Sequence, residues 1–384
     1  MIRHILPPLL VASAVVVCGV DRILAQIRIS PSASLEVQIP AAPASVRIGS
    51  RNHLVYEVHI TNVRTVDLAL ARVDVLGDRS GASPLASYQD TDLRTRLARV
   101  GARPDASDTR VISAGARVVL FVWLALDEGV AVPATLRHRI ALQVPSHEGE
   151  AGVVESGPID VRRDSPVVLD APLRGGPWVA VYDPAMTGGH RRALFAVAGK
   201  MRIPARFAID WIRLGDDGQS VRGDRSILSN HHGYGAEVLA VGDGVVTAVV
   251  ADLPEPTIPI TPDNAAGNYL TIDLGGGRFA SYEHVQPHSI TLKVGDRVRS
   301  GQIVARLGAS GSVSSGPHLH FHVSDANSAL GAEGLPYVFK SFEVLGAFES
   351  IQALVSGNAW APLPIERVRT QQLELPHHQT VLRF

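Results

Sequence analysis

The sequence predicts an all-β protein built from two folded domains. The chain has 384 residues, which is more than one ordinary hydrophobic core requires. Its composition, with 46% hydrophobic and 19% charged residues, is typical of a folded globular protein. Short segments in which apolar and polar residues alternate recur in both halves and are separated by turn residues. This alternation is the pattern of half-buried strands, so we expect sheets in both domains.

The first half consists of short predicted strands. The segments that alternate or form apolar runs are 35–39, 54–60, 71–75, 118–124 and 138–144. Strands at this spacing, with turn residues between them, favour an immunoglobulin-like β-sandwich. The spacing of apolar residues over 90–100 predicts one inserted helix. We find no chemical motif in this half and interpret it as an accessory domain that positions a substrate, binds a surface or covers a site.

The second half follows a polar segment with three prolines and contains further predicted strands. These strands are expected at 207–214, 245–250, 269–273, 279–284, 303–307 and 319–323. The resulting division of the chain is a signal peptide at 1–25, the sandwich at 26–159, a linker at 160–177, the second domain at 178–350 and a C-terminal extension at 351–384.

The pattern of residues 1–25 predicts a signal peptide for export. Arg3 and His4 give it a basic start, an apolar run follows to Val20, and the segment ends at Ala25, a residue suited to cleavage. The run is short for a helix that spans a membrane. We therefore expect the protein in the periplasm or cell envelope, with attachment to the membrane only if the segment stays uncleaved.

Charge and cysteine content narrow the classes of function. The net charge of −1 argues against binding to nucleic acid, which needs a basic surface. The single cysteine, Cys18, lies in the predicted signal peptide. The mature chain is therefore expected to have neither disulfides nor thiolate metal ligands. Any catalytic metal must then be held by histidines and carboxylates.

Three histidines mark the last predicted strand of the second half. His318, His320 and His322 occupy alternate positions, and alternate residues of a strand share a face at a spacing of about 7 Å. Phe321 and Val323 then point into the core. Three imidazoles on one face would each need a buried partner, whereas one metal ion can bind several of them. The spacing therefore favours a metal or catalytic site over structural histidines.

Four segments of the second half resemble the lysostaphin/LytM-type zinc peptidases. They lie at 235–246, 282–285, 293–302 and 310–321, and the last ends in Gly-Pro-His-Leu-His-Phe. Their order and spacing agree with the family over about residues 204–323. The resemblance implies an antiparallel β-sheet domain with a groove, known as the duplicated hybrid motif, and a Zn²⁺ ion. It also implies hydrolysis of peptide bonds in peptidoglycan cross-links or stem peptides, with peptidoglycan as the partner.

The resemblance also assigns roles to individual residues. His320 and Asp210 resemble two zinc ligands of the family. His318 resembles the general base or water-orienting residue, and His284 resembles the residue that stabilises the transition state. The remaining ligand of the family is a histidine four residues before the aspartate, but Arg206 stands at that position here. A guanidinium stays protonated and cannot bind zinc, so either another residue completes the site or the site is degraded.

His190 is our preferred replacement for the missing ligand. We expect a hairpin with a three-residue turn at 198–200, in which Val197 pairs with Met201. In that register His190 lies diagonal to Asp210 across the ladder, within side-chain reach of a common ion. A two-residue turn would reverse the parity and remove this argument.

His231 and His232 are the rival candidates, because they precede a glycine-rich turn in a loop that could overhang the groove. His288, in another turn, is interpreted as structural. His377 and His378 lie in the C-terminal tail and are assigned no role.

Two other functions compete with a zinc peptidase. The first is a non-catalytic relative that acts as an activator or scaffold for cell-wall hydrolases, with cell-envelope proteins as partners. Arg206 favours this alternative, whereas the retained Asp210, His284, His318 and His320 count against it. The second is a carrier domain, because 294–302 resembles the turn of biotinyl and lipoyl modules. That segment lacks the modifiable lysine at a hairpin tip, and the histidines would stay unexplained.

Overall fold

The computed structural model of the protein describes residues 34–78, 83–101, 108–145, 151–186, 188–256, 261, 264–313 and 316–384. The predicted signal peptide with Cys18 lies outside these residues, as does the pair 314–315 of the histidine segment. Strands dominate the described ranges, so the prediction of an all-β protein is confirmed. In these ranges no helix combines the length and the apolar character needed to span a membrane.

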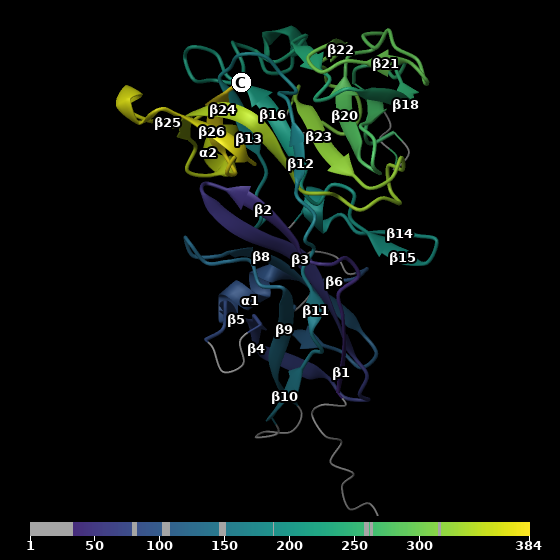
Figure 1. Cartoon of the computed structure of the whole chain (residues 1–384), viewed down its shortest axis with the longest axis vertical. Coiled ribbons are helices and arrows are strands. Elements are labelled where there is room, and N and C mark those ends of the chain that lie inside the picture. Colours follow the sequence, from purple (N-terminus) through teal and green to yellow (C-terminus); the bar gives the residue numbers. More distant parts are fainter. Residues whose placement is uncertain are drawn as a thin grey trace, which may run out of the picture.

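The strands form two bodies that follow one another along the long axis of the molecule (Figure 1). Two antiparallel sheets build the first body. One has the order β1 (Leu35–Gln38), β3 (Arg51–Asn62), β8 (Arg117–Ala125) and β6 (Leu97–Arg99), with β2 (Ala44–Ile48) beside β3. The other has the order β10 (Ala151–Glu155), β9 (Thr135–Gln143), β4 (Leu68–Leu76) and β5 (Ala86–Gln89), with β11 (Ile159–Asp160) on β9 and β7 (Val111–Ile112) on β4.

Apolar side chains from both sheets share one core, so the first body is a β-sandwich. Its immunoglobulin-like character stays a prediction. The predicted inserted helix corresponds to α1 (Asp90–Arg96), and the chain continues from it directly into β6.

Strands β3 and β8 are buried on both faces. On one face, residues such as Tyr56 belong to the core of the sandwich. On the other face, Val55 and Glu57 of β3 and Phe121 of β8 are also buried. The second body covers this face, because Val55 joins its core and Phe121 packs against Ile203.

One large sheet dominates the second body. Its strand order is β12 (Val167–Leu169), β24 (Tyr337–Ala347), β27 (Thr380–Arg383), β13 (Trp178–Val181), β16 (Ile209–Arg213), β23 (Leu319–Ser324), β20 (Phe279–Val285), β19 (Asn268–Asp273), β18 (Gly244–Val250) and β21 (Arg297–Val298). Strands β25 (Ala361–Pro362) and β26 (Arg369–Glu374) also pair with β24. The predicted linker thus contributes β12 to this sheet, and the predicted extension contributes β25, β26 and β27. Helix α2 (Ile351–Val355) lies before these last strands.

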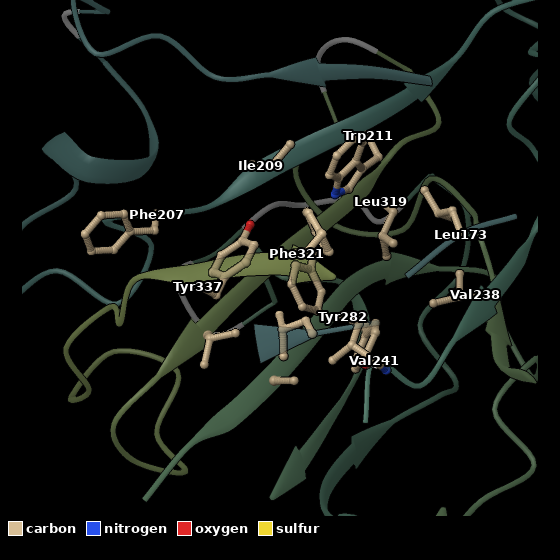
Figure 2. Packing of buried hydrophobic residues seen from close by; sticks show 14 of the residues in the cluster. Leu173, Phe207, Ile209, Trp211, Val238, Val241, Tyr282, Leu319, Phe321 and Tyr337 are labelled. Carbon is tan, nitrogen blue, oxygen red and sulfur yellow. Dashed lines mark hydrogen bonds between the residues drawn. The ribbon is translucent and has the colours of Figure 1, made fainter. Parts of the chain in front are cut away.

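The centre of the large sheet carries an aromatic core on one face. Phe321 of β23 and Tyr282 of β20 are buried together with Tyr337 of β24 (Figure 2). The ring of Phe321 lies 5.1 Å from that of Tyr282 and 5.4 Å from that of Tyr337, measured between centroids. Neighbouring residues of a strand point to opposite faces. The core position of Phe321 therefore places His320 and His322 on the other face.

Two short antiparallel sheets complete the second body: β14 (Phe195–Val197) with β15 (Lys200–Arg202), and β17 (Glu237–Leu239) with β22 (Ile303–Arg306). The predicted register of the first pair is wrong. Val197 pairs with Lys200, which leaves Ala198 and Gly199 as a two-residue turn. Both turn residues have positive φ, 49° and 75°, as in the type I′ turn that matches the twist of hairpin strands. Because this turn reverses the parity, the pairing argument for His190 fails.

Candidate metal centre

Three neighbouring strands bring polar side chains to one face of the large sheet. Asp210 on β16 pairs directly with His320 on β23, and His320 pairs with Glu283 on β20. Opposed residues of antiparallel strands have Cβ atoms about 4.5–5.5 Å apart. The register therefore places one carboxylate on each side of the His320 imidazole.

Asp210 is the centre of the contacts on this face. Its Oδ1 lies 2.9 Å from Nδ1 of His320 and 3.7 Å from Nε2 of His318. Its Oδ2 lies 3.1 Å from Nε2 of His190. Ligand atoms of His190, Asp210 and His320 all lie within 4.8 Å of one another. Two imidazole nitrogens and a carboxylate oxygen form a donor set that zinc prefers, so these residues fit the ion implied by the resemblance.

His190 reaches Asp210 by a route that the sequence did not indicate. Gly189, with φ of 81°, leads into the 3-10 helix η3 (His190–Arg192), which precedes the β14–β15 hairpin. From this turn the ring of His190 meets that of His320 edge to face, with 4.8 Å between the centroids. Helix η3, and not strand pairing, therefore brings His190 to the group.

The carboxylates give the group a negative electrostatic character. Burial alone would raise the pKa of Asp210, but electrostatic interactions with His190 and His318 and hydrogen bonds from His190 and His320 hold this pKa well below its usual range. Burial alone would lower the pKa of His320, but Glu283 and Asp210 raise it to about 9. The two carboxylates therefore favour positive charge at this position.

His284 and His318 lie next to this group, with 4.8 Å between their ring centroids. Each donates its Nδ1–H to a backbone carbonyl at 2.8 Å, His284 to Ser310 and His318 to Gly316. Because a carbonyl oxygen only accepts, Nε2 is the unprotonated nitrogen of each neutral ring. Burial is the main cause that lowers the pKa of both histidines, which keeps the rings neutral. Both can therefore accept a proton at Nε2.

The second ring nitrogen of His320 also has a partner. Nε2 of His320 lies 3.1 Å from Nδ1 of His322, which in turn lies 3.7 Å from Oε1 of Glu283. Such partners orient a ligating histidine and fix which of its nitrogens carries the proton. Sequence reasoning gave Glu283 no role. The available signal was its place beside His284, in a strand that could pair with the histidine strand.

Arg206 forms its ion pairs with carboxylates outside the group. Its guanidinium is buried and contacts Oε2 of Glu57 at 2.9 Å and Oε2 of Glu333 at 2.8 Å. The position of the usual histidine ligand is therefore occupied by a side chain that joins the two bodies.

The rival histidines lie elsewhere. Nε2 of His231 is 2.9 Å from the carbonyl oxygen of Arg225, and His232 packs against Gly215. Among the described residues, neither belongs to a group of three potential metal ligands.

The polar face of the large sheet thus carries a candidate metal centre, a group of histidines and carboxylates that could hold a zinc ion. Residues 229–331 match peptidase family M23. The resemblance to lysostaphin/LytM-type peptidases is thereby confirmed. The match includes His284, His318 and His320 but begins after Arg206 and Asp210. The segment that departs from the family pattern therefore lies outside it.

Solved structures of M23 proteins are similar to this chain. One is a mutant catalytic domain of the prophage-encoded M23 protein EnpA from Enterococcus faecalis, with 22% identity over 43% of this chain and 93% of that chain and a TM-score of 0.27. Another is the catalytic domain of the antimicrobial peptidase lysostaphin from Staphylococcus simulans, with 20% identity over 42% of this chain and 88% of that chain and a TM-score of 0.24. These similarities add no argument to the family match. No curated protein matches the chain.

Proposed function

We propose that this protein is an exported zinc metalloendopeptidase that hydrolyses peptide bonds in peptidoglycan cross-links or stem peptides. The observation that carries the proposal is the group of His190, Asp210 and His320, whose ligand atoms lie within 4.8 Å of one another. Catalytic zinc sites commonly use three protein ligands and keep one position open. The M23 match over 229–331 supports a peptidase, and the predicted signal peptide supports action in the periplasm or cell envelope.

The chain supplies the ligands and the groups that move protons. A zinc ion held by His190, Asp210 and His320 would polarise the scissile carbonyl and make water more acidic. His318 and His284 each present an unprotonated Nε2 beside these residues. Either ring can take a proton from the attacking water and return it to the leaving amine. Once protonated, a ring also donates a hydrogen bond to the oxygen that develops negative charge.

The second candidate function is that of a non-catalytic relative that activates or organises cell-wall hydrolases through cell-envelope protein partners. The position of Arg206 favours this function. Arg206 stands where the family has a ligand, and its guanidinium forms ion pairs with Glu57 and Glu333. His190 beside Asp210 weakens this alternative, since it supplies a third donor.

Digestion of purified peptidoglycan separates the two functions. The full mature chain is incubated with peptidoglycan, with and without a zinc chelator, and released fragments are identified by mass. We expect chelator-sensitive release of peptides, lost in His320→Ala and retained in the matched surface variant His288→Ala. No release by a folded, zinc-loaded protein would support the non-catalytic relative.

A further inference from the structure

The segment that carries His190 lies against the N-terminal sandwich. Nη2 of Arg192 donates to the carbonyl oxygen of Thr95 at 2.7 Å, and its guanidinium lies 4.9 Å from the centre of the Phe121 ring. Leu194 and Ile203 pack in a small apolar cluster with Phe121. The residues that follow His190 therefore contact the sandwich, whereas the tip of the β14–β15 hairpin is exposed.

Arg191, the residue directly after His190, is buried against the outer face of the sandwich. The residue is 5% exposed, and its Nη2 contacts Oε1 of Glu57 at 3.2 Å and the carbonyl oxygen of Val122 at 3.0 Å. Its guanidinium also lies 5.3 Å from the centre of the Trp123 ring. An arginine buried to this extent needs its carboxylate partner, since an unpaired buried charge is costly.

The same carboxylate holds the segment that precedes Asp210. Oε2 of Glu57 lies 3.0 Å from Nε of Arg206, which is four residues before Asp210 in the chain. Arg206 is also bound to Glu333 at 2.8 Å. Glu57, from β3 of the sandwich, thus connects the two segments that supply His190 and Asp210.

We propose that Glu57 is a positioning residue of the metal centre, which acts through Arg191 and Arg206 to hold His190 beside Asp210. The N-terminal sandwich is then a structural part of the zinc site, and zinc affinity depends on the docking of the two bodies. This inference rests on the proposed function, in which His190 and Asp210 bind zinc.

The first test measures zinc affinity of the full mature chain by competition with a chromogenic chelator. Glu57→Gln keeps the shape of the side chain but removes its charge. We expect it to weaken zinc binding about tenfold or more, the effect of losing a group that orients a ligand. Arg191→Lys keeps a charge beside Glu57 but loses the planar fork, so we expect a smaller loss. This variant also serves if Glu57→Gln does not fold.

The matched control is Arg47→Gln. Arg47 of β2 pairs with Glu374 of β26 at 2.9 Å, so this variant also breaks an ion pair between the two bodies. The pair shares no residue with the Glu57 contacts. We expect unchanged zinc affinity, which would show that weakening the interface in general is not sufficient.

A double-mutant cycle with His190→Ala tests the route of the effect. If Glu57 acts through His190, Glu57→Gln causes no further loss of zinc affinity in the His190→Ala background. An equal loss in both backgrounds would overturn the proposal, because Glu57 would then not act through His190.

Hydrogen exchange of the metal-free protein gives a readout that does not need zinc. We expect faster exchange of the backbone amides at 189–193 in Glu57→Gln than in the unmodified chain or in Arg47→Gln. If the unmodified chain binds no zinc but exchange rises as expected, the proposed function fails while the positioning role stands. If the chain binds zinc and Glu57→Gln changes neither affinity nor exchange, the positioning role fails alone.

Discussion

His320 has a different partner at each ring nitrogen. Nδ1 contacts Asp210, and Nε2 contacts Nδ1 of His322. Nδ1 of His322 also lies 3.7 Å from Oε1 of Glu283. If Nδ1 faces the metal, His322 holds the proton of Nε2 in place and thereby fixes the tautomer that binds.

Replacement of His322 tests this arrangement. We expect His322→Leu to weaken zinc binding roughly 10- to 100-fold, the range for partners that orient metal ligands. His322→Gln keeps an acceptor for the Nε2–H of His320 and should lose less. Affinity is measured by chelator competition. Equal losses in both variants would mean that His322 contributes by packing and not by orienting His320.

His190 is distinguished from its rivals by a second set of variants. We expect His190→Ala to weaken zinc binding by more than about 100-fold, above the range for orienting partners, because a ligand is removed. His231→Ala and His232→Ala leave affinity unchanged, since their side chains contact Arg225 and Gly215 and not Asp210. Metal content after dialysis provides the measurement. Loss of zinc in His232→Ala with retention in His190→Ala would reverse the ligand assignment.

The sequence indicates those residues of the group whose signal is local. Alternation in one strand puts His320 and His322 on one face, and family spacing points to Asp210. Glu283 becomes visible only through the pairing of β20 with β23, which joins residues about 40 positions apart. His190 depends on the 3-10 turn of η3, for which the sequence carries no periodic pattern.

At the level of elements, alternation predicted where strands lie, but it did not predict the pairing register of the β14–β15 hairpin. The turn after Val197 could hold two or three residues, and each choice places opposite sets of side chains on a given face. Positive φ at both Ala198 and Gly199 selects the two-residue turn. The alanine at a left-handed position concealed this turn, because glycine or asparagine is usual there.

A hydrogen bond between Tyr56 and His138 connects strands β3 and β9 of the sandwich. Protonation of this histidine opposes folding. Nε2 of His138 lies 2.8 Å from the hydroxyl oxygen of Tyr56, between the two sheets. Burial lowers the pKa of His138 to about 4, whereas an unfolded histidine has a pKa of about 6.5. The contribution of neutral His138 to the free energy of unfolding is therefore fully present above about pH 6.5. It is lost as the pH falls towards 4, because the unfolded state binds the proton at a higher pH than the folded state does.

We expect His138 to reduce the free energy of unfolding by about 2 kcal/mol between pH 7 and pH 5. Chemical denaturation at both pH values measures this change. His138→Gln retains a hydrogen-bonding group but cannot titrate, so its pH dependence should be smaller than that of the unmodified chain by this amount. An identical pH dependence would show that His138 is charged in the folded protein or does not control stability.

At the scale of the whole molecule, the contact between the two bodies is the least predictable feature. Glu57 and Arg206 are 149 positions apart; Glu57 lies in the alternating segment 54–60, and Arg206 directly precedes the predicted strand 207–214. Alternation identifies the two faces of β3, but it does not reveal that another body covers the polar one. Nothing local in the sequence pairs these charges.

Arg206→His, which introduces the usual residue of the family, tests whether His190 replaces the ligand expected at position 206. In this chain the side chain at 206 faces Glu57 and Glu333, and His190 already lies beside Asp210. We therefore expect no gain in zinc affinity. Loss of a buried charge partner should instead lower the free energy of unfolding by about 3–5 kcal/mol.

Denaturation measures the stability of each variant, and chelator competition on the same samples measures its zinc affinity. Together they decide whether His190 replaces the missing ligand or the site has lost a ligand. Arg202→His is the matched control, because Arg202 also pairs with Glu333, at 3.3 Å, but is partly exposed and makes no contact with Glu57 among the described ion pairs. We expect it to have a small effect on both quantities, since exposed ion pairs contribute about 0–1 kcal/mol. Tighter zinc binding by Arg206→His at unchanged stability would mean that the site lacks a ligand that His190 does not supply. The non-catalytic function would then be favoured, because the interface would have been gained at the expense of the metal centre.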